Sequence, residues 1–574
     1  MTRTHVFLVA VAYASALIAS SMVSARVIED TLHVSIMNMS RLCSEQLIPV
    51  VNKSLPGPII EAREGDAIIL HVLNDSPYEL TIHWHGIHQL LSCWADGATY
   101  VTQCPILPGN NYTYKFTIRE QEGTMWWHAH HQWLRATLYG AFIIRPKGGR
   151  PYAYNVTPYE EVVIALGEWW NANVVDVEME GLATGGGFNN SDAFTINGLP
   201  GDLYPCTSQN ETYELKVVQG KTYLLRIINA ALNNQLFFMI AHHSFTVVAV
   251  DSSYTNPCKT DVILVAPGQT TDVLLIADQS PGTYYMAARA YASAAGVPID
   301  NTTTRARLVY DGANDAPSTP PMPRLPDYND TATAHRFYSN LTALLTAPFR
   351  YPVPTHVDHH MFIAFGFGLY PCGENATCEG PFGQRLAASM NNISFVFPSR
   401  QSILEAHFYG LSGAYDVGFP SQPLRIFDYT NTSLSLDRSL LMTNKSTIVK
   451  EFEFNSTIEI VWQNTALVTI ENHPMHIHGF DFHVMAQGFG NYDPENDPVK
   501  FNLKDPQIRN TIGVPAGGWA VIRFRANNPG SWLVHCHLDS HLPWGLAGVF
   551  IVKNGGTNAS TLPPPPKDLP SCEA

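Results

Sequence analysis

The chain has 574 residues, of which 45% are hydrophobic and 14% charged, with 40 glycines and 40 prolines. This length predicts more than one domain, and the few charges and many turn-forming residues favour strand-rich globular domains. The net charge of −15 at pH 7 argues against nucleic acid or an anionic membrane surface as a partner.

Residues 1–25 are predicted to form a signal peptide. Arg3 precedes an apolar run over residues 6–19, and Val23-Ser24-Ala25 provides the small residues of a cleavage site. The run is too short to span a bilayer comfortably and no later stretch is a better candidate, so we expect no membrane anchor. Sixteen N-x-S/T sequons agree with secretion and with N-linked glycans.

A strand–turn–strand pattern recurs three times along the chain. It is predicted at residues 65–86, 220–243 and 456–479. A second recurring element follows each copy, with a Gly-led strand, a turn and an aromatic strand, at residues 109–130, 268–290 and 517–537. We therefore predict an all-β fold of three consecutive β-sandwich domains. Their ranges are 26–147, 158–312 and 400–574, with a Pro-rich linker at 313–350. Residues around 351–400 show no pattern that assigns them.

Four histidine clusters occupy corresponding positions in the first and third repeats. They are His83 with His85, His128 with His130, His473 with His476 and His478, and His535 with Cys536, His537 and His541. Alternate residues of a strand face the same side, so an H-x-H pair can serve one metal or two adjacent ones. One such pair is more often structural than a ligand pair, but four at matching points of a repeat indicate metal ligands. The middle repeat has Met286-Ala287-Ala288 instead, which predicts a spacer domain without ligands.

Cysteine and imidazole together favour copper. His473, Cys536 and His541 make a His₂Cys set, which suits a blue-copper electron-transfer centre. The eight remaining histidines of the clusters suit three coppers held by three, three and two imidazoles. Zinc could use imidazoles too, but it has no redox use for the cysteine. On a strand, Cys536 points away from His535 and His537, so it would bridge two kinds of site.

The motifs WWHAH, WLRATLYGA, WADG, VTQCPI and GNYDPENDP resemble those of the multicopper oxidases, and most closely those of plant laccases. The resemblance runs from about Arg26 to the C-terminus. It implies cupredoxin-like Greek-key domains and four copper ions.

The resemblance also implies a role for each ligand. His473, Cys536 and His541 would hold the type 1 copper, with Leu546 at the axial position as a residue that cannot ligate. His83 and His476 would hold the type 2 copper. The two type 3 coppers would be held by His130, His478 and His535, and by His85, His128 and His537. Asp96 resembles the proton-relay carboxylate of the family, although its place before Gly97 equally suits a turn residue.

The implied activity is one-electron oxidation of phenolic molecules, such as diphenols and monolignols, coupled to four-electron reduction of O₂ to water. The donor would give its electron at an exposed edge of His473. The implied setting is the apoplast or cell wall, in lignin or phenolic polymerisation or turnover, with the protein as a monomer. Ascorbate or metal-ion oxidation is the alternative activity, and metal-ion oxidation requires carboxylates beside the type 1 histidines. A non-catalytic cell-wall glycoprotein is the alternative of another class, but such proteins tend to lose the ligands.

The other eight cysteines permit four disulfides in a secreted protein. The short spacing between Cys372 and Cys378 permits a local bridge. The resemblance implies that Cys104 pairs with Cys572 and that Cys43 pairs with Cys206. It leaves Cys93 and Cys258 without an assigned partner.

Overall fold

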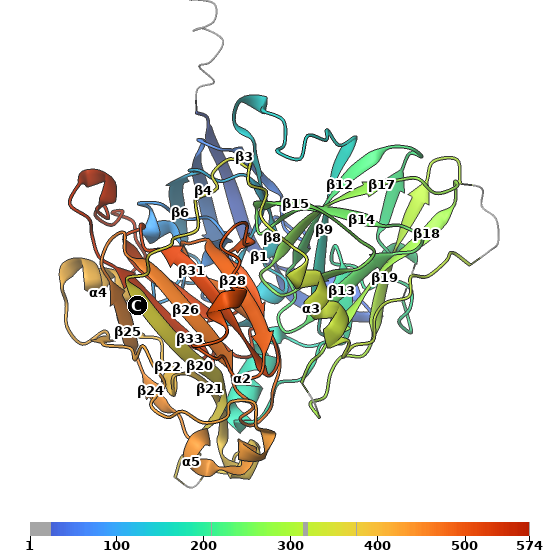
Figure 1. The fold of residues 1–574 in the computed structure, drawn as a ribbon. Coiled ribbons are helices and arrows are strands. Elements are labelled where there is room, and N and C mark those ends of the chain that lie inside the picture. Colours follow the sequence, from blue (N-terminus) through green and yellow to red (C-terminus); the bar gives the residue numbers. More distant parts are fainter. Residues whose placement is uncertain (1–24, 208, 295, 314–318, 375, 573–574) are drawn as a thin grey trace, which may run out of the picture.

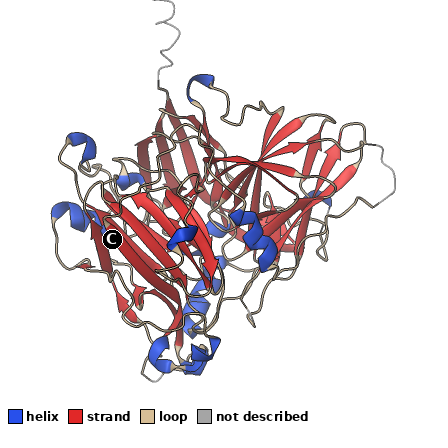
Figure 2. Cartoon of the chain, in the orientation of Figure 1, coloured by secondary structure: helices blue, strands red, loops and turns tan. Residues whose placement is uncertain are grey.

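The computed structural model describes residues 25–207, 209–294, 296–313, 319–374 and 376–572. The signal peptide predicted at residues 1–25 lies outside this part of the chain, except for Ala25. Strands dominate the described residues, and the helices are short and lie mostly at the edges of the sheets (Figure 2). Six sheets make up three sandwiches, which run from blue through green to red in Figure 1. The predicted all-β fold of three domains is confirmed.

The first sandwich contains two four-stranded sheets. One sheet consists of β1 (Val27–Arg41), β2 (Ser44–Val51), β4 (Ala67–Asn74) and β6 (Asn111–Thr117), in the order β2-β1-β4-β6. The other consists of β3 (Ile60–Arg63), β5 (Ile82–His85), β7 (Gly123–Ala129) and β8 (Tyr139–Arg145), in the order β3-β8-β7-β5. In β5, Ile82 and Trp84 belong to the apolar core of the domain. Because side chains alternate along a strand, His83 and His85 face away from that core.

The second sandwich, drawn in green, has sheets of six and five strands. The larger sheet contains β9 (Glu160–Trp169), β10 (Ala193–Ile196), β12 (Thr222–Asn229), β14 (Phe245–Val250), β15 (Ser253–Thr260) and β17 (Thr270–Ile276). The smaller sheet contains β11 (Glu214–Val217), β13 (Gln235–Ile240), β16 (Ile263–Val265), β18 (Thr283–Tyr291) and β19 (Thr303–Tyr310). The apolar residues of the second domain form a core of their own, as expected of a domain that can fold independently.

The third sandwich has sheets of eight and six strands. The larger sheet contains β20 (His359–Tyr370), β21 (Arg385–Met390), β22 (Ile393–Phe395), β24 (Asn444–Ser446), β26 (Thr457–Asn464), β28 (Phe482–Phe489), β29 (Ile508–Arg509) and β31 (Gly518–Arg525). The smaller sheet contains β23 (Asp416–Val417), β25 (Ile448–Phe452), β27 (His473–Ile477), β30 (Thr511–Val514), β32 (Gly530–Cys536) and β33 (Ala547–Val552). Strand β20 pairs with β26, so residues upstream of the expected boundary at 400 belong to this sheet.

The strand pairing shows the repeat that the sequence predicts. In each domain the first repeated strand (β4, β12 or β26) lies parallel to β1, β9 or β20. The same strand is antiparallel to β6, β17 or β31. In the other sheet, β5 pairs with β7 and β27 with β32, which sets His83 opposite His128 and His476 opposite His535. The corresponding pair in the second domain is β13 with β18, where Phe238 lies opposite Ala288.

In the described part of the chain, four α-helices connect these sheets: α2 (Val174–Thr184), α3 (Thr331–Ser339), α4 (Ile403–Tyr409) and α5 (Arg438–Leu441). Helix α3 lies within the predicted linker and is capped by Asp330, whose carboxylate accepts from Thr333 N at 2.9 Å. Phe337 and Tyr338 of α3 pack into the core of the second domain, so this part of the linker is attached to that domain. No helix among the described residues is long and apolar enough to span a membrane.

Three disulfides join cysteines of the described residues. Cys43–Cys206 and Cys104–Cys572 are the pairs implied by the resemblance, and Cys372–Cys378 is the local bridge that the spacing permits. Cys93 and Cys258 are free, so the four bridges that eight cysteines permit are not all formed in the described chain. Cys93 is buried, with its sulfur 3.5 Å from Ser531 O.

Candidate metal centre

The predicted ligands come together where the first and third domains meet. They are His83, His85, His128, His130, His473, His476, His478, His535, Cys536, His537 and His541. They fall into groups of three whose donor atoms all lie within 4.8 Å of one another. Three groups contain only histidine, one contains Cys536, and one adds Asp96 to two histidines. The register of β5 with β7 and of β27 with β32 brings these side chains to one place.

Two all-histidine groups each take ligands from both domains. They are His85, His128 and His537, and His130, His478 and His535. In the first, Nε2 of His537 lies 3.1 Å from Nδ1 of His85. In the second, the Nε2 atoms of His478 and His535 are 3.3 Å apart. These are the two sets that the resemblance assigns to the type 3 coppers, and the assignment to individual ions stays a prediction.

The third all-histidine group joins His83 and His476, the predicted type 2 pair, to His85. The rings of His85 and His476 stack with centroids 4.0 Å apart and planes 19° apart. His83 stacks on His478 in the same way, also at 4.0 Å. Two of the groups therefore share His85, and the stacking of His83 on His478 joins the third group to them in one continuous cluster.

Most histidines of the cluster form a hydrogen bond through the ring nitrogen that does not face the other ligands. Nδ1 of His83, His128, His476 and His535 donates to the backbone oxygens of Asp96, Ala129, Asn510 and Cys536, at 2.7, 2.8, 2.8 and 2.8 Å. With the proton on Nδ1, a neutral imidazole has its lone pair on Nε2. The Nε2 atoms of His83, His128 and His476 are buried and have no hydrogen-bond partner in the described structure. Buried lone pairs that converge without a partner are what metal ligands require, so the cluster fits the coppers that the sequence predicts.

Burial keeps these imidazoles neutral. The pKa values of His85, His128 and His476 lie well below the usual histidine value, chiefly because burial disfavours the charged form and next because neighbouring charged groups, mostly other histidines, oppose it. The pKa values of His478 and His537 are lowered by burial in the same way. Neutral imidazole is the form that binds a metal ion.

The Cys536 group lies on the opposite side of β32. Cys536 Sγ is 3.3 Å from Nδ1 of His541 and 3.6 Å from Nδ1 of His473, and all three residues are buried. Burial raises the pKa of the Cys536 thiol, so ionisation here requires a bound cation. His535 and His537, its neighbours in the chain, belong to the two all-histidine groups. The predicted bridge between two kinds of site is therefore present in the geometry.

Leu546 is buried beside this group. Its N–H donates to His541 O at 3.0 Å, and its carbonyl accepts from Cys536 N at 3.1 Å. The Leu546 side chain packs in the same apolar cluster as Cys536. A hydrocarbon side chain has no donor atom, so the predicted lack of an axial ligand agrees with this environment.

The exposed edge expected for His473 is not found, and that expectation is wrong. His473 has no accessible surface, because Phe365 and Phe367 pack against its ring with centroids 5.3 and 5.5 Å away. His541 is 3% exposed, and its Nε2 lies 2.9 Å from the carboxylate of Glu471, whose side chain is 21% exposed. The partly exposed Glu471 therefore contacts the buried Cys536 group through His541.

Asp96 lies against the cluster and is completely buried. Its carboxylate is 2.9 Å from Nδ1 of His478 and 3.4 Å from Nδ1 of His83. The next residue, Gly97, has φ +83°, and a Cβ there would lie 1.8 Å from Ile82 O. A constrained turn therefore follows Asp96, and the Asp96 carboxylate also contacts two predicted ligands. Its role as a proton relay stays a prediction.

The described residues of the middle domain contribute no member to these groups, but they contact segments that carry ligands. The Arg135 guanidinium of the first domain is buried and donates to the carbonyls of Ala231 and Leu232 in the second domain, both at 3.1 Å. It also donates to His537 O at 3.0 Å and pairs with Asp539 at 3.2 Å. Arg135 therefore ties the three domains together at a ligand, and the motif WLRATLYGA contains it.

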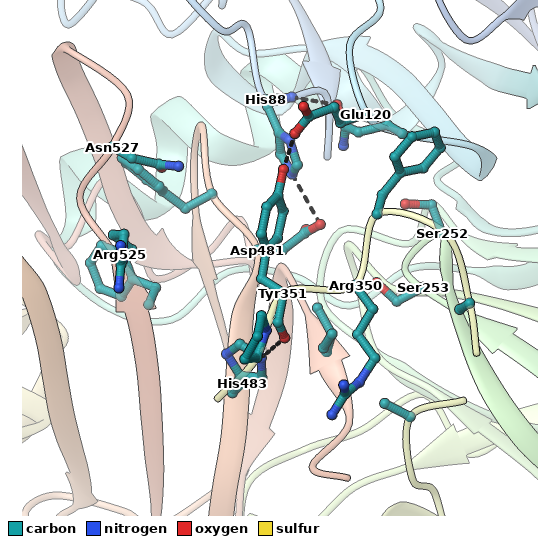
Figure 3. A pocket seen from close by; sticks show the side chains of 18 of the residues that line it. His88, Glu120, Ser252, Ser253, Arg350, Tyr351, Asp481, His483, Arg525 and Asn527 are labelled. Carbon is teal, nitrogen blue, oxygen red and sulfur yellow. Dashed lines mark hydrogen bonds and ion pairs between the residues drawn. The ribbon is translucent and has the colours of Figure 1, made fainter. Parts of the chain in front are cut away.

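Two cavities lie near the centre. The larger, about 600 Å³, lies where all three domains and the linker meet, and Figure 3 shows its polar lining. There His88 pairs with Asp481 at 3.0 Å, and the Tyr351 hydroxyl donates to Glu120. Gly479, the residue after a cluster histidine, also lines it.

The smaller cavity, about 210 Å³, is lined in part by Phe365, Phe367, Leu424 and Phe427. Because the two β20 phenylalanines contact His473, the smaller cavity is the one beside the Cys536 group.

Sequence reasoning missed several residues that contact ligands, among them Glu471, Asn510 and Arg135. Glu471 lies two residues before His473, and a carboxylate so close to a ligand was a usable signal. Asn510 lies in a segment without histidine, whereas Arg135 follows the predicted ligand His130 by five residues. The contacts of both residues depend on domain packing. Nothing in their local sequence indicates those contacts.

Comparison with known proteins agrees with this geometry. Three family models, each described as multicopper oxidase, match residues 33–149, 160–313 and 418–556. The chain therefore belongs to the multicopper oxidase family, and its histidine clusters fit type 1, type 2 and type 3 copper sites.

Several similar proteins carry the name laccase. Laccase-7 of Arabidopsis thaliana is 57% identical over 557 residues, which covers 96% of this chain and 97% of the relative. Laccase-24 of Oryza sativa subsp. japonica is 52% identical over 574 residues, with 98% of each chain covered. The solved laccase of Botrytis aclada superposes with a TM-score of 0.70 at 26% identity, covering 94% of this chain and 89% of that one.

Proposed function

We propose that this multicopper oxidase acts as a laccase on phenolic donors such as diphenols and monolignols. Four donors each lose one electron and one proton, and O₂ takes up four electrons and four protons to give two waters. The observation that carries the proposal is the position of Cys536. Its sulfur faces His473 and His541, while His535 and His537 on either side belong to the all-histidine groups.

Each ligand has a proposed role. Copper bound at Cys536, His473 and His541 would supply one-electron chemistry, and copper at the other eight histidines would supply the reduction of O₂. The chain itself contributes dry surroundings, neutral imidazoles and fixed ring orientations. Glu471 accepts from Nε2 of His541, which orients that ring towards an approaching donor. Asp96 lies where it can pass a proton towards His83 and His478.

The test is copper loading followed by oxygen uptake. Protein with four coppers per chain is expected to be blue and to consume O₂ with a diphenol, one O₂ for every four donor molecules. Cys536→Ser is expected to abolish both the colour and the oxygen uptake. Cys93→Ser removes another buried free thiol and is expected to change neither. A colourless wild type at full copper loading would refute the proposal.

Metal-ion oxidation is a second candidate, and one observation favours it. Such an activity requires carboxylates beside the type 1 histidines, and the Glu471 carboxylate contacts His541 at 2.9 Å. If Fe(II) were the donor, Glu471→Gln would remove the charge that holds the ion. Its kcat/KM for Fe(II) would then fall by at least tenfold, while that for a diphenol would change much less. Laccase activity predicts that wild-type oxygen uptake is faster with phenols than with Fe(II).

The proposed location is the apoplast or cell wall, with the protein as a monomer that carries N-linked glycans. The predicted signal peptide and the sequons support this location. Asn38, Asn111 and Asn444 are exposed, which a glycan requires. The Asn74 sequon is an exception, because its side chain is buried and donates to Tyr78 O at 2.8 Å. Intact-mass measurement of protein secreted by plant cells, before and after glycosidase treatment, tests secretion and the presence of N-linked glycans.

A further inference from the structure

Asn510 contacts one ligand from each of two domains. Its side-chain Oδ1 lies 3.2 Å from Nε2 of His85, which belongs to the first domain. Its backbone oxygen lies 2.8 Å from Nδ1 of His476, which belongs to the third. These two imidazoles are the stacked pair, and Asn510 is 2% exposed. A single buried residue therefore touches neighbouring members of the cluster that the proposed function assigns to type 3 and type 2 copper.

The two contacts have opposite chemical consequences. A neutral imidazole carries its proton on one nitrogen and its lone pair on the other. The backbone oxygen of Asn510 places the proton of His476 on Nδ1 and leaves the lone pair on Nε2, as in His83 and His128. The side-chain oxygen places the proton of His85 on Nε2 and leaves the lone pair on Nδ1. That Nδ1 is the atom that faces His537 Nε2 at 3.1 Å.

The orientation of the Asn510 amide is itself determined by a neighbour. The Thr511 hydroxyl donates to Asn510 Oδ1 at 2.9 Å and lies 3.3 Å from Nε2 of His85. The second domain holds this segment in turn, because Gln269 donates to Thr511 O at 3.0 Å. Arg509 of the same segment pairs with Asp251 of the second domain at 3.3 Å. The acceptor on Asn510 is therefore anchored by contacts to the ligand-free domain.

We infer that Asn510 is a positioning residue of the centre, which sets the tautomer of His85 so that Nδ1, and not Nε2, is offered to copper. The inference rests on the proposed function, since it takes His85, His128 and His537 as ligands of one copper. Without the Asn510 side-chain oxygen, the acceptor left near Nε2 of His85 is the Thr511 hydroxyl at 3.3 Å, which also lies 3.0 Å from Nδ1 of His476. The preference for a proton on Nε2 then weakens, and the tautomer with its proton on Nδ1 would present an N–H to the metal, which cannot ligate.

The experiment measures copper and not only turnover. Asn510→Ala removes the side-chain acceptor but keeps the backbone oxygen that holds His476. We expect copper in the His85 group to bind 10- to 100-fold more weakly, the usual cost of losing such a supporting contact. Titration with a chelator, followed by metal analysis, should show one copper per chain leaving early. The type 3 copper that remains in the His130 group should become visible by electron paramagnetic resonance, because it no longer couples magnetically with a second type 3 copper. The blue colour should stay.

Two matched variants make the result decisive. Asn510→Asp keeps an acceptor oxygen in place and is expected to retain four coppers with near wild-type affinity. Asn528 is also 2% exposed and also crosses the domain boundary, donating to His88 O and Gly479 O at 2.6 and 3.2 Å. Asn528→Ala loses comparable contacts, but neither of them is made to a proposed ligand. This variant is therefore expected to keep four coppers.

Three results would overturn the inference while leaving the proposed function intact. They are wild-type copper affinity in Asn510→Ala, loss in Asn510→Asp as large as in the alanine variant, or equal loss in Asn528→Ala. A wild type that binds no copper would instead overturn the proposed function, and the inference with it.

Discussion

The Asp96 carboxylate lies 2.9 Å from Nδ1 of His478, although the two residues are 382 positions apart in the sequence. Asp96 belongs to the first domain and His478 to the third, so the pair exists only when these domains are docked. The same holds for each of the three all-histidine groups, which mix ligands from both domains. Copper binding and domain docking are therefore coupled, because a metal that binds only the docked state stabilises it.

Replacing Asp96 by Asn is expected to slow oxygen reduction without displacing the ligands. The amide keeps an acceptor for Nδ1 of His478 but cannot deliver a proton. A lost proton-transfer group costs about 10²–10⁴ in rate. Anaerobic reduction by a diphenol should proceed at the wild-type rate, and reoxidation by O₂ should be slow in stopped-flow absorbance.

The control is Asp66→Asn, a buried carboxylate that accepts from Arg26 N and Arg63 N, both at 2.9 Å, away from the histidines. It should leave both half-reactions unchanged. Reoxidation of Asp96→Asn at the wild-type rate would exclude the relay role.

Leu546→Met is expected to lower the reduction potential of the blue copper. The thioether would add a weak donor at the axial position and stabilise Cu(II) relative to Cu(I). Phenols with high potentials should then be oxidised more slowly. Redox titration of the blue absorption measures the shift. Leu546→Ile preserves volume without adding a donor, and an equal shift in that variant would show that packing, not ligation, is responsible.

Gly97→Ala is expected to be far more damaging than Gly109→Ala. Both glycines have positive φ, +83° and +77°. A Cβ at Gly109 meets nothing within 4 Å, whereas one at Gly97 would lie 1.8 Å from Ile82 O. The Gly109 variant should lose about 1–2 kcal/mol of unfolding free energy from backbone strain alone. The Gly97 variant should lose copper as well, because Ile82 precedes His83. Chemical denaturation and metal analysis of both variants measure the difference, and similar losses would contradict it.

Glu178→Gln is expected to flatten part of the pH dependence of stability. Burial raises the pKa of Glu178 from 4.5 to about 8, so the folded protein keeps this carboxyl protonated where the unfolded chain ionises it. The unfolded state then binds fewer protons, and stability falls as pH rises between these two values. The maximum slope is about 1.4 kcal/mol per pH unit.

The glutamine variant should equal wild type near pH 4.5 and exceed it increasingly up to pH 8 in thermal unfolding. Glu180→Gln, on the exposed face of the same helix, serves as the control and should track wild type throughout. A difference between Glu178→Gln and wild type that stays constant with pH would contradict the buried protonated carboxyl.

Most of the fold and most ligands could be predicted, because both depend on short-range patterns. Alternation along β5 and β32 determines which face a histidine occupies, whatever the rest of the chain does. The repeat also indicated which domains carry ligands. Where the first and third domains have a histidine opposite a histidine, the second domain has Phe238 opposite Ala288. The linker was harder to predict, because α3 is stabilised by packing of Phe337 and Tyr338 against another domain.

By itself, the sequence determined the chemistry of the centre: the cysteine, the ten histidines and the absence of a donor at Leu546. Only the tertiary structure decided how solvent reaches it. His473 is covered by Phe365 and Phe367, whereas His541 contacts the partly exposed Glu471. It also decided which ring nitrogen of His85 is free, through Asn510. Ligand identity is a local property of the chain, whereas burial and tautomer depend on neighbours that only domain docking supplies.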